Sequence, residues 1–365
     1  MANKREYGVD LLRVICMTGI VGAHVLVAGQ AYTMNPSATG SVLFLLQFFT
    51  HFTVNLFPII TGYFYSGRKT VKFANLIGLI VNLQAYALVI TAVLFVFSTN
   101  FLVDFTSIFG SLFPVTTGAY WYFAAYVLVF LMIPWMNLLI RNMNHRQFSA
   151  LLIVGFVLFC IVPAWSKVDY FKMLEGYSPY WLIYCYFIGA YLRQYKDRHI
   201  GRLKKWVYPM IFLFNLGIAL GIYLLAGNGI VTEGFLNQHT RFIAPISMVN
   251  VMCMMFFFMD LEVKNTTAQK LLVSLSGAAF DVYMFHCHHY FYDIFIRGNF
   301  RFLQDLSPVM ALIGYIASVL GLYLFGWICC LIRKKIFKLI MIDDLVQWIG
   351  SKVDIIQAKV WNAAE

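Results

Sequence analysis

Arg13 and His24 lie eleven residues apart in the apolar run VDLLRVICMTGIVGAHV, residues 9–25. In an α-helix this spacing is close to three full turns, so the two side chains share one stripe and lie about 16 Å apart along the axis. Ionisable groups within a membrane are costly and usually line a functional site. The alternatives are an arginine that reaches the headgroups or is neutralised by Asp10, and a histidine that packs between helices.

The two side chains suit a ligand with an anionic head and a reactive tip. The guanidinium of Arg13 offers a fixed charge and forked donors to phosphate. Histidine as a residue type titrates near neutrality, so His24 can take a proton from a hydroxyl during acyl transfer, or accept the acyl group transiently. Acyl-coenzyme A carries phosphates at one end and a thioester at the other, and it is the co-substrate that we expect. We expect no permanently bound cofactor and no metal.

The composition predicts that these residues are positioned by membrane-spanning helices. Of 365 residues, 61% are apolar and 12% are charged, whereas a soluble domain has about half and a quarter. Apolar runs approach the length of about 20 residues that spans a bilayer at residues 9–29, 41–65, 73–98, 119–140, 148–164, 179–193, 206–226, 240–259, 270–292 and 306–332. We predict an all-α polytopic bundle of about ten helices over residues 1–339. Residues 340–365 should form an amphipathic tail along the cytosolic interface.

The basic residues predict the orientation of the bundle. The formal charge is +11, and the cations cluster in short loops between the apolar runs. If the N-terminus is cytosolic, 21 of the 27 basic residues lie on the cytosolic side, five lie in outer loops, and the remaining one is Arg13. Cytosolic loops of membrane proteins are enriched in Lys and Arg. We therefore expect both termini in the cytosol, a bacterial plasma membrane as the location, and no nucleic-acid partner.

Several stretches resemble the acyltransferase-3 family of integral membrane acyltransferases. The first is Asp10, Arg13 and His24 in the first span. VNLFPIITGYFYSG at 54–67, AYWYFAAYVLVFLMIPWMN at 119–137 and LSGAAFDVYMFH at 275–286 are similar to three further family segments. Thr61 replaces a serine and keeps its hydroxyl, and Pro58 replaces an aromatic residue and should kink the second span. After His286, where the family often has a proline, the sequence reads CHHY.

The resemblance implies a reaction and a set of site residues. The reaction is transfer of an acetyl group, or another acyl group, from cytosolic acetyl-coenzyme A to a hydroxyl of a cell-surface or lipid-linked saccharide. Arg13 and Asp10 would bind the phosphorylated end of the donor, and His24 would act on the acceptor hydroxyl. Substrate-binding residues would be Thr61, Gly62, Tyr63, Trp121, Tyr122 and His286. Helix packing is the alternative for Gly62, and we interpret Tyr120 as part of an aromatic belt at the membrane interface.

Other interpretations of the same residues have less support. His286, His289 and Asp293 follow an i, i+3, i+7 pattern that would place them on one helix face, but three ligands from one helix rarely converge on an ion, so we interpret them as a polar stripe. A transporter of saccharide or lipid intermediates would also suit a polytopic bundle, and it predicts two related halves, which we do not see. A non-catalytic partner of a polysaccharide-synthesis complex would tolerate the loss of His24.

Overall fold

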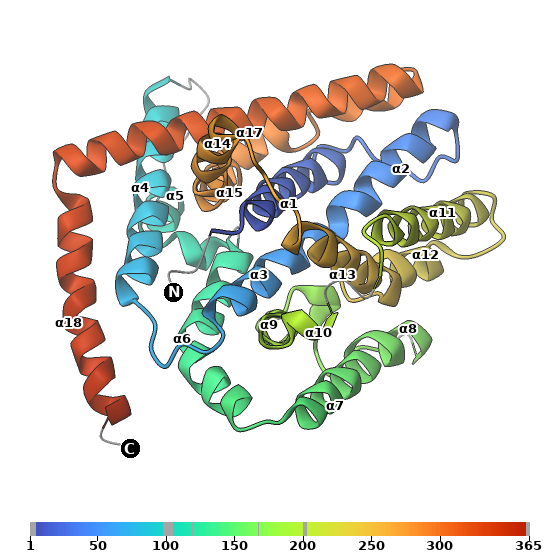
Figure 1. The fold of residues 1–365 in the computed structure, drawn as a ribbon. Coiled ribbons are helices and arrows are strands. Elements are labelled where there is room, and N and C mark those ends of the chain that lie inside the picture. The colour runs from blue at the N-terminus through green and yellow to red at the C-terminus, as the bar shows by residue number, and fades with distance from the viewer. Residues whose placement is uncertain (1–4, 98–104, 119, 167, 200–202, 363–365) are drawn as a thin grey trace. The chain divides into compact units, whose positions relative to one another are not determined.

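A computed structural model describes residues 5–97, 105–118, 120–166, 168–199 and 203–362, and all secondary structure in these residues is helical (Figure 1). The predicted fold class, an all-α polytopic membrane protein, is confirmed. Three of the cations used to predict the orientation, Lys4, Lys167 and Arg202, lie outside the described residues.

Eight helical segments of the described chain are long and apolar enough to cross a membrane, and each coincides with an expected span. They are α1 (Tyr7–Leu26), Ala38–Tyr65, α4 (Phe73–Phe97), α6 (Trp121–Arg141), His145–Ser166, α11 (Val207–Gly227), Glu233–Met259 and α17 (Pro308–Leu339). α9 (Pro179–Gln194) coincides with the expected span 179–193 and has 16 residues, fewer than any of these eight segments. Only the expected span 270–292 differs from the prediction, because it is divided among α14 (Thr266–Ser276), α15 (Ala279–His286), α16 (His289–Phe291) and the start of η5 (Tyr292–Ile296).

The remaining elements are shorter or are parts of these spans. They are α2 (Ala38–His51), η1 (Phe52–Asn55), α3 (Leu56–Tyr65), α5 (Phe105–Leu112), η2 (Pro114–Thr117), α7 (His145–Phe156), η3 (Val157–Ile161), α8 (Val162–Ser166), η4 (Leu174–Gly176), α10 (Lys196–His199), α12 (Glu233–Thr240), α13 (Pro245–Met259), η6 (Arg301–Asp305) and α18 (Ile342–Asn362).

The chain forms two compact units. Unit 1 comprises Met1–Ser66, Met143–Ala279 and Ile296–Tyr323, and unit 2 comprises Gly67–Asn142, Phe280–Phe295 and Leu324–Glu365. The predicted site residues are divided between them. Asp10, Arg13, His24 and residues 61–63 belong to unit 1, whereas Trp121, Tyr122 and His286 belong to unit 2.

In unit 1 the second span is interrupted where the sequence predicts a kink. The 3₁₀ turn η1 separates α2 from α3, and Pro58 is the third residue of α3. Proline lacks the N–H that would continue the α-helical ladder back to residue 54. Asn55 stabilises the chain at this interruption. Its Nδ2 donates to the Phe242 carbonyl at 2.8 Å, and its Oδ1 accepts from Trp181 Nε1 at 2.8 Å. Its buried amide is therefore satisfied by two distant segments.

Glycines allow α3 and α9 to lie side by side in unit 1 (Figure 1). A Cβ at Gly62 would overlap the Tyr186 carbonyl on α9, and a Cβ at Gly189 would overlap the Ile59 carbonyl on α3. Small residues at such contacts let the backbones of membrane helices approach closely. The C-terminal end of α3, and with it Tyr63, is thereby held against α9.

The N-terminal end of α1 lies beside the C-terminal end of α13. A side chain at Gly8 would overlap the carbonyls of Phe258 and Leu261, which stand at the end of α13. Further along α1, Gly19 packs on Thr53 and Gly22 packs on the Tyr315 hydroxyl. α1 is thus in close contact with other parts of unit 1 along most of its length.

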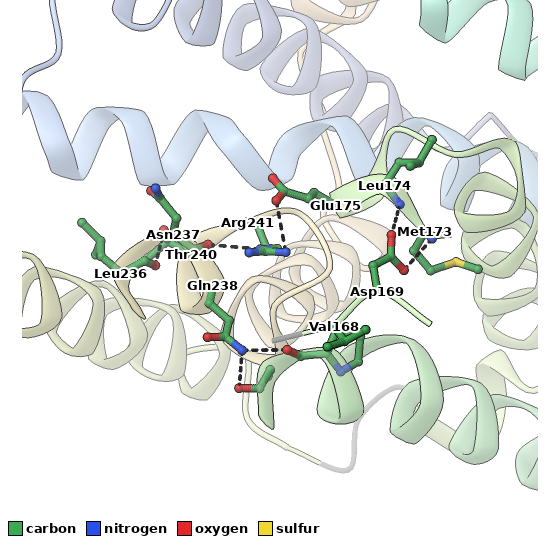
Figure 2. Close-up of polar contacts among 12 residues, drawn as sticks. Val168, Asp169, Met173, Leu174, Glu175, Leu236, Asn237, Gln238, Thr240 and Arg241 are labelled. Atoms are coloured by element: carbon green, nitrogen blue, oxygen red, sulfur yellow. Dashed lines mark hydrogen bonds and ion pairs between the residues drawn. The ribbon is translucent and has the colours of Figure 1, made fainter. Parts of the chain in front are cut away.

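Polar contacts hold α8 and η4 against the end of α12, just before α13 begins (Figure 2). Arg241 NH1 lies 3.2 Å from Glu175 Oε1, and Gln238 Nε2 donates to the carbonyls of Pro163 and Ala164. The Asp169 carboxylate accepts from two backbone N–H groups, at residues 173 and 174 (Figure 2). From these contacts α13 runs towards Gly8 at the start of α1.

In unit 2, α18 lies along the first turns of α4 (Figure 1). Asp354 Oδ1 accepts from the Phe73 N–H at 2.8 Å, and Gln357 Oε1 accepts from the Val71 N–H at 3.2 Å. A Cβ at Gly350 would overlap Ala74. α18 therefore supplies an acceptor to the orphan N–H of Phe73 at the start of α4 and another to the N–H of Val71 just before it. Residues 363–365 of the tail lie outside the described residues.

Candidate functional site

Asp10 is the centre of an ion cluster in the first turns of α1. Its carboxylate is 4% exposed and accepts from Arg5 Nε at 2.6 Å, Arg13 NH1 at 3.3 Å and Ser276 Oγ at 3.2 Å. A buried carboxylate is stable only when it is paired and hydrogen-bonded. The guanidinium of Arg13 lies 4.9 Å from the ring centre of Phe64 on α3. Asp10 and Phe64 therefore fix the direction of Arg13, whose side chain stays 31% exposed.

A second ion cluster surrounds Glu6, just before α1 begins. Glu6 Oε1 accepts from Arg193 NH1 at 2.9 Å and Lys196 Nζ at 3.3 Å, and Glu6 Oε2 accepts from the Tyr63 hydroxyl at 2.9 Å. Partial burial lowers the pKa of Lys196, but the Tyr63 hydroxyl and the Glu6 charge outweigh burial and leave this pKa above its usual value. The Lys196 ammonium is therefore charged at neutral pH.

The two clusters give this end of unit 1 an excess of positive charge. Four cations accompany two carboxylates, and they come from the N-terminal segment, α1, α9 and α10: Arg5, Arg13, Arg193 and Lys196, with Glu6 and Asp10. Phosphate groups bind where several cations and donors converge. This end of unit 1 can therefore accept an anionic ligand.

The three neighbouring residues Thr61, Gly62 and Tyr63 have different environments. The Thr61 hydroxyl donates to the Phe57 carbonyl of its own helix at 2.9 Å, and Gly62 faces the backbone of α9. The Tyr63 hydroxyl belongs to the Glu6 cluster. The structure brings Tyr63 together with charged residues, whereas Gly62 lies in a helix contact, as its alternative interpretation expects.

His24 lies in the last turn of α1 and is half-buried. α1 is uninterrupted from Tyr7 to Leu26, so Arg13 and His24 do lie on one stripe, about 16 Å apart along the axis. The His24 carbonyl accepts from the Gly29 N–H at 2.9 Å. The imidazole is therefore carried by the ordered end of a helix, close in sequence to the contact between Gly22 and Tyr315.

In unit 2, three predicted site residues belong to one aromatic cluster. The rings of Trp121 and Tyr122 lie 5.5 Å apart, those of Tyr122 and Tyr283 lie 6.1 Å apart, and those of Tyr283 and His286 lie 6.2 Å apart. His286 is fully buried, and its Nε2 lies 3.5 Å from Cys287 Sγ. α6 and α15 thus meet through aromatic rings, and Trp121 is the more exposed of the two α6 residues.

The comparison with protein families agrees with these features. The family model of acyltransferase-3, described as an acyltransferase domain, matches residues 6–329. The chain belongs to the acyltransferase-3 family. It is a membrane acyltransferase, and the match begins at Glu6 and ends within α17. No curated protein and no solved structure matches the chain at a significant level.

Two interpretations of the acyltransferase sequence are wrong. Tyr120 does not belong to an aromatic belt, because it is fully buried and its hydroxyl donates to the Met284 carbonyl at 2.9 Å. His286, His289 and Asp293 do not share one helix face. α15 ends at His286, α16 starts at His289, and Asp293 lies in the π-helical turn η5.

The sequence reasoning missed four residues of the acyltransferase that accompany Arg13 at the charged end of unit 1. Glu6 was assigned no role, and Arg5, Arg193 and Lys196 were counted only as cations that set the orientation. Glu6 and the two cations that it pairs with, Arg193 and Lys196, lie far apart in sequence, so spacing gives no signal. The available signal was the position of Glu6, an acidic residue directly before a span whose neighbouring loops are basic.

Proposed function

We propose that this acyltransferase moves an acetyl group from acetyl-coenzyme A to a hydroxyl of a cell-surface or lipid-linked saccharide. The observation that carries the proposal is the geometry of α1. A guanidinium held by a buried carboxylate stands near one end of this helix, and an imidazole lies about 16 Å further along the same stripe.

In this proposal the charged end of unit 1 binds the phosphates of the donor. Arg13 supplies forked donors, and the ammonium of Lys196 adds charge. Asp10 does not touch the donor, since its oxygens already accept from Arg5, Arg13 and Ser276. We assign Asp10 a positioning role, which is to hold Arg13 in place. The thin arm of coenzyme A then carries the thioester towards His24.

His24 acts as the general base in the proposed reaction. The unprotonated nitrogen of its imidazole takes the proton of the acceptor hydroxyl while the hydroxyl oxygen attacks the thioester carbonyl carbon. The carbon–sulfur bond then breaks, and the sulfur of coenzyme A leaves as a thiol with the proton that His24 had taken. The products are an O-acetyl ester and free coenzyme A, and His24 returns to its starting state.

The acceptor saccharide is assigned to the aromatic cluster of unit 2. Trp121 and Tyr122 offer ring faces on which a sugar ring can stack, and we propose that His286 adds a polar contact within the same unit. In unit 1, we propose that Thr61 and Tyr63 contribute polar contacts to substrate. For Gly62 we propose only that it lets α3 approach α9. The protein is proposed to work in a bacterial plasma membrane with both termini in the cytosol, in keeping with its distribution of cations.

The proposal is tested by kinetics on the purified protein in lipid nanodiscs. His24→Ala should lower the rate of acetyl transfer at least about 100-fold, the low end for general acid–base catalysis. His239→Ala is the matched control, because His239 is also half-buried in unit 1 and its Nδ1 hydrogen-bonds the Phe235 carbonyl of its own helix. Arg13→Gln should raise KM for acetyl-coenzyme A about tenfold or more, as expected for a lost charge-assisted hydrogen bond. Full activity of His24→Ala would overturn the proposal.

Two further measurements test the mechanism of transfer and the identity of the acceptor. Without an acceptor, a general base gives no exchange of label between acetyl-coenzyme A and free coenzyme A, whereas an acyl-histidine intermediate gives rapid exchange. In cells, proton NMR of surface polysaccharide should show that O-acetyl signals are lost both on deletion of the gene and with His24→Ala. Polysaccharide that keeps its O-acetyl groups in the deletion strain would exclude a surface saccharide as the acceptor.

A further inference from the structure

Unit 1 contains an apolar cavity that the proposed reaction does not use. Its volume is about 480 Å³, and it lies among α7, α9, α11 and α13. Phe156, Ile188, Tyr208, Met248 and Phe256 are among the side chains that line it, and the wall is almost entirely apolar. From Met248 to Phe256 the cavity extends along eight residues of α13, or about 12 Å. An elongated apolar cavity of this kind suits an alkyl chain better than a compact polar solute.

One end of the cavity opens towards polar residues. Tyr191 lines the cavity, and its hydroxyl lies 3.1 Å from His145 Nε2 and 2.9 Å from Ser149 Oγ. His145 is the first residue of α7, and Tyr191 lies in the last turn of α9. This end of the cavity therefore coincides with helix ends, where a membrane protein meets the headgroup region.

Cations surround the same end. Leu203 lines the cavity and is followed by Lys204 and Lys205, and Arg146 follows His145. The Arg198 guanidinium lies 5.5 Å from the ring centre of Tyr195, and that ring lies 4.5 Å from the ring of His145. The acidic residues of these segments are Asp197 and Asp260, and Asp260 pairs with Lys205 at 3.2 Å. Four cations against two carboxylates leave this end positively charged.

We propose that the cavity binds one acyl chain of an anionic phospholipid and that the surrounding cations bind its headgroup. Hydrocarbon gains little when it moves from a bilayer into an apolar cavity, because lipid tails are as apolar as the side chains that line it. Selectivity must therefore come from the headgroup. Basic pockets between membrane helices bind anionic headgroups in this way. The inference is independent of the proposed reaction, since His24 and Arg13 do not line the cavity.

The experiment is a lipid titration of the purified, delipidated full-length protein in a neutral detergent, followed by native mass spectrometry. Phosphatidylglycerol and phosphatidylcholine with identical chains are the two probes. We expect one phosphatidylglycerol to bind at least about fivefold more tightly than phosphatidylcholine, which corresponds to one cation near a lipid surface. Lys204→Gln should reduce this preference about fivefold. Acetyl-coenzyme A should not displace the lipid.

Val249→Phe is designed to fill the cavity, because Val249 lines it and is 40% exposed. Val93→Phe is the matched control, since Val93 is a 49% exposed valine of the spanning helix α4 and does not line the cavity. We expect Val249→Phe to lose the tightly bound lipid and Val93→Phe to keep it. Equal binding of the two lipids, or an unchanged lipid on Val249→Phe, would overturn the proposal.

A measurement on the unmodified chain keeps the proposal testable if Val249→Phe does not fold. Cys253 lines the cavity, so phosphatidylglycerol should slow its alkylation by a small apolar maleimide. Cys329, which is half-buried on α17, should react at the same rate with and without the lipid. Equal rates at Cys253 with and without phosphatidylglycerol would contradict the inference.

Discussion

Asp281 and Arg333 form a buried ion pair within unit 2, and breaking it should destabilise the protein strongly. Arg333 Nε donates to Asp281 Oδ1 at 2.6 Å, and the two side chains are 12% and 6% exposed. Asp281→Ala leaves the guanidinium without its counter-charge, because Asn82 and the Phe337 ring, which it also contacts, are neutral. The Tyr86 hydroxyl also loses its acceptor. Breaking a buried pair by removing one partner costs about 3–5 kcal/mol.

This loss can be measured as a shift in the thermal midpoint of the purified protein in detergent. A chain of 365 residues has an unfolding entropy of about 0.8 kcal/mol/K if every residue unfolds. A loss of about 3–5 kcal/mol then lowers the midpoint by roughly 4–6 °C. Membrane helices keep much of their structure in detergent, so the entropy is smaller and this shift is a lower bound. Tryptophan fluorescence follows the transition.

Asp260→Ala is the matched control, because it breaks an ion pair that is exposed. Lys205 and Asp260 lie 3.2 Å apart with 58% and 44% of their side chains exposed, and exposed pairs contribute about 0–1 kcal/mol. The double variant Asp281→Leu with Arg333→Met removes both buried charges and should recover most of the loss. Equal shifts for Asp281→Ala and Asp260→Ala, or no recovery in the double variant, would refute the reasoning.

Three further substitutions test the packing within each unit. Gly62→Ala places a Cβ against the α9 backbone and should cost about 1–3 kcal/mol, whereas Gly217→Ala, which meets no atom within 4 Å, should not lower the thermal midpoint. Asp354→Ala removes the acceptor of a backbone N–H at the start of α4 and should cost about 1 kcal/mol, seen as faster amide hydrogen exchange across α18. Asn55→Leu leaves the Trp181 N–H buried without an acceptor and should lower the midpoint by an amount equivalent to about 1–3 kcal/mol.

The spans could be predicted from sequence because lipid imposes one rule on every residue of a membrane helix. A backbone in hydrocarbon must satisfy its hydrogen bonds internally and present apolar side chains. Eight expected spans follow this rule. The breaks in the helix within residues 270–292 were not predicted, because hydropathy measures apolar character and does not detect where a helix ends. The chain leaves the α-helix after Ser276 and again after His286, but apolar residues continue past both breaks.

The candidate site was predictable only where one helix carries the residues. Arg13 and His24 belong to α1, so helical periodicity relates them directly. Glu6 and Arg193 are 187 residues apart, and no periodicity connects them. Arg193 also fits the charge pattern that sets membrane orientation. That role was enough to explain its presence in the sequence, so no role in the site was predicted for it. Tyr120 was misjudged for the same reason, since a tyrosine at the end of a span suits either an interface or a buried bond to a distant carbonyl.

The contacts of α1 give the spacing between Arg13 and His24 a physical basis. Gly8, Gly19 and Gly22 each bring the α1 backbone against another part of unit 1, and a side chain at any of them would force the helix away from its neighbour. α1 is therefore held at its start, its middle and its end, and it cannot slide by a turn without breaking all three contacts. In the proposed reaction, these contacts fix the distance between Arg13, which binds the donor phosphates, and His24, which acts at the thioester. The length of the donor, as well as its charge, therefore decides which ligand reaches His24.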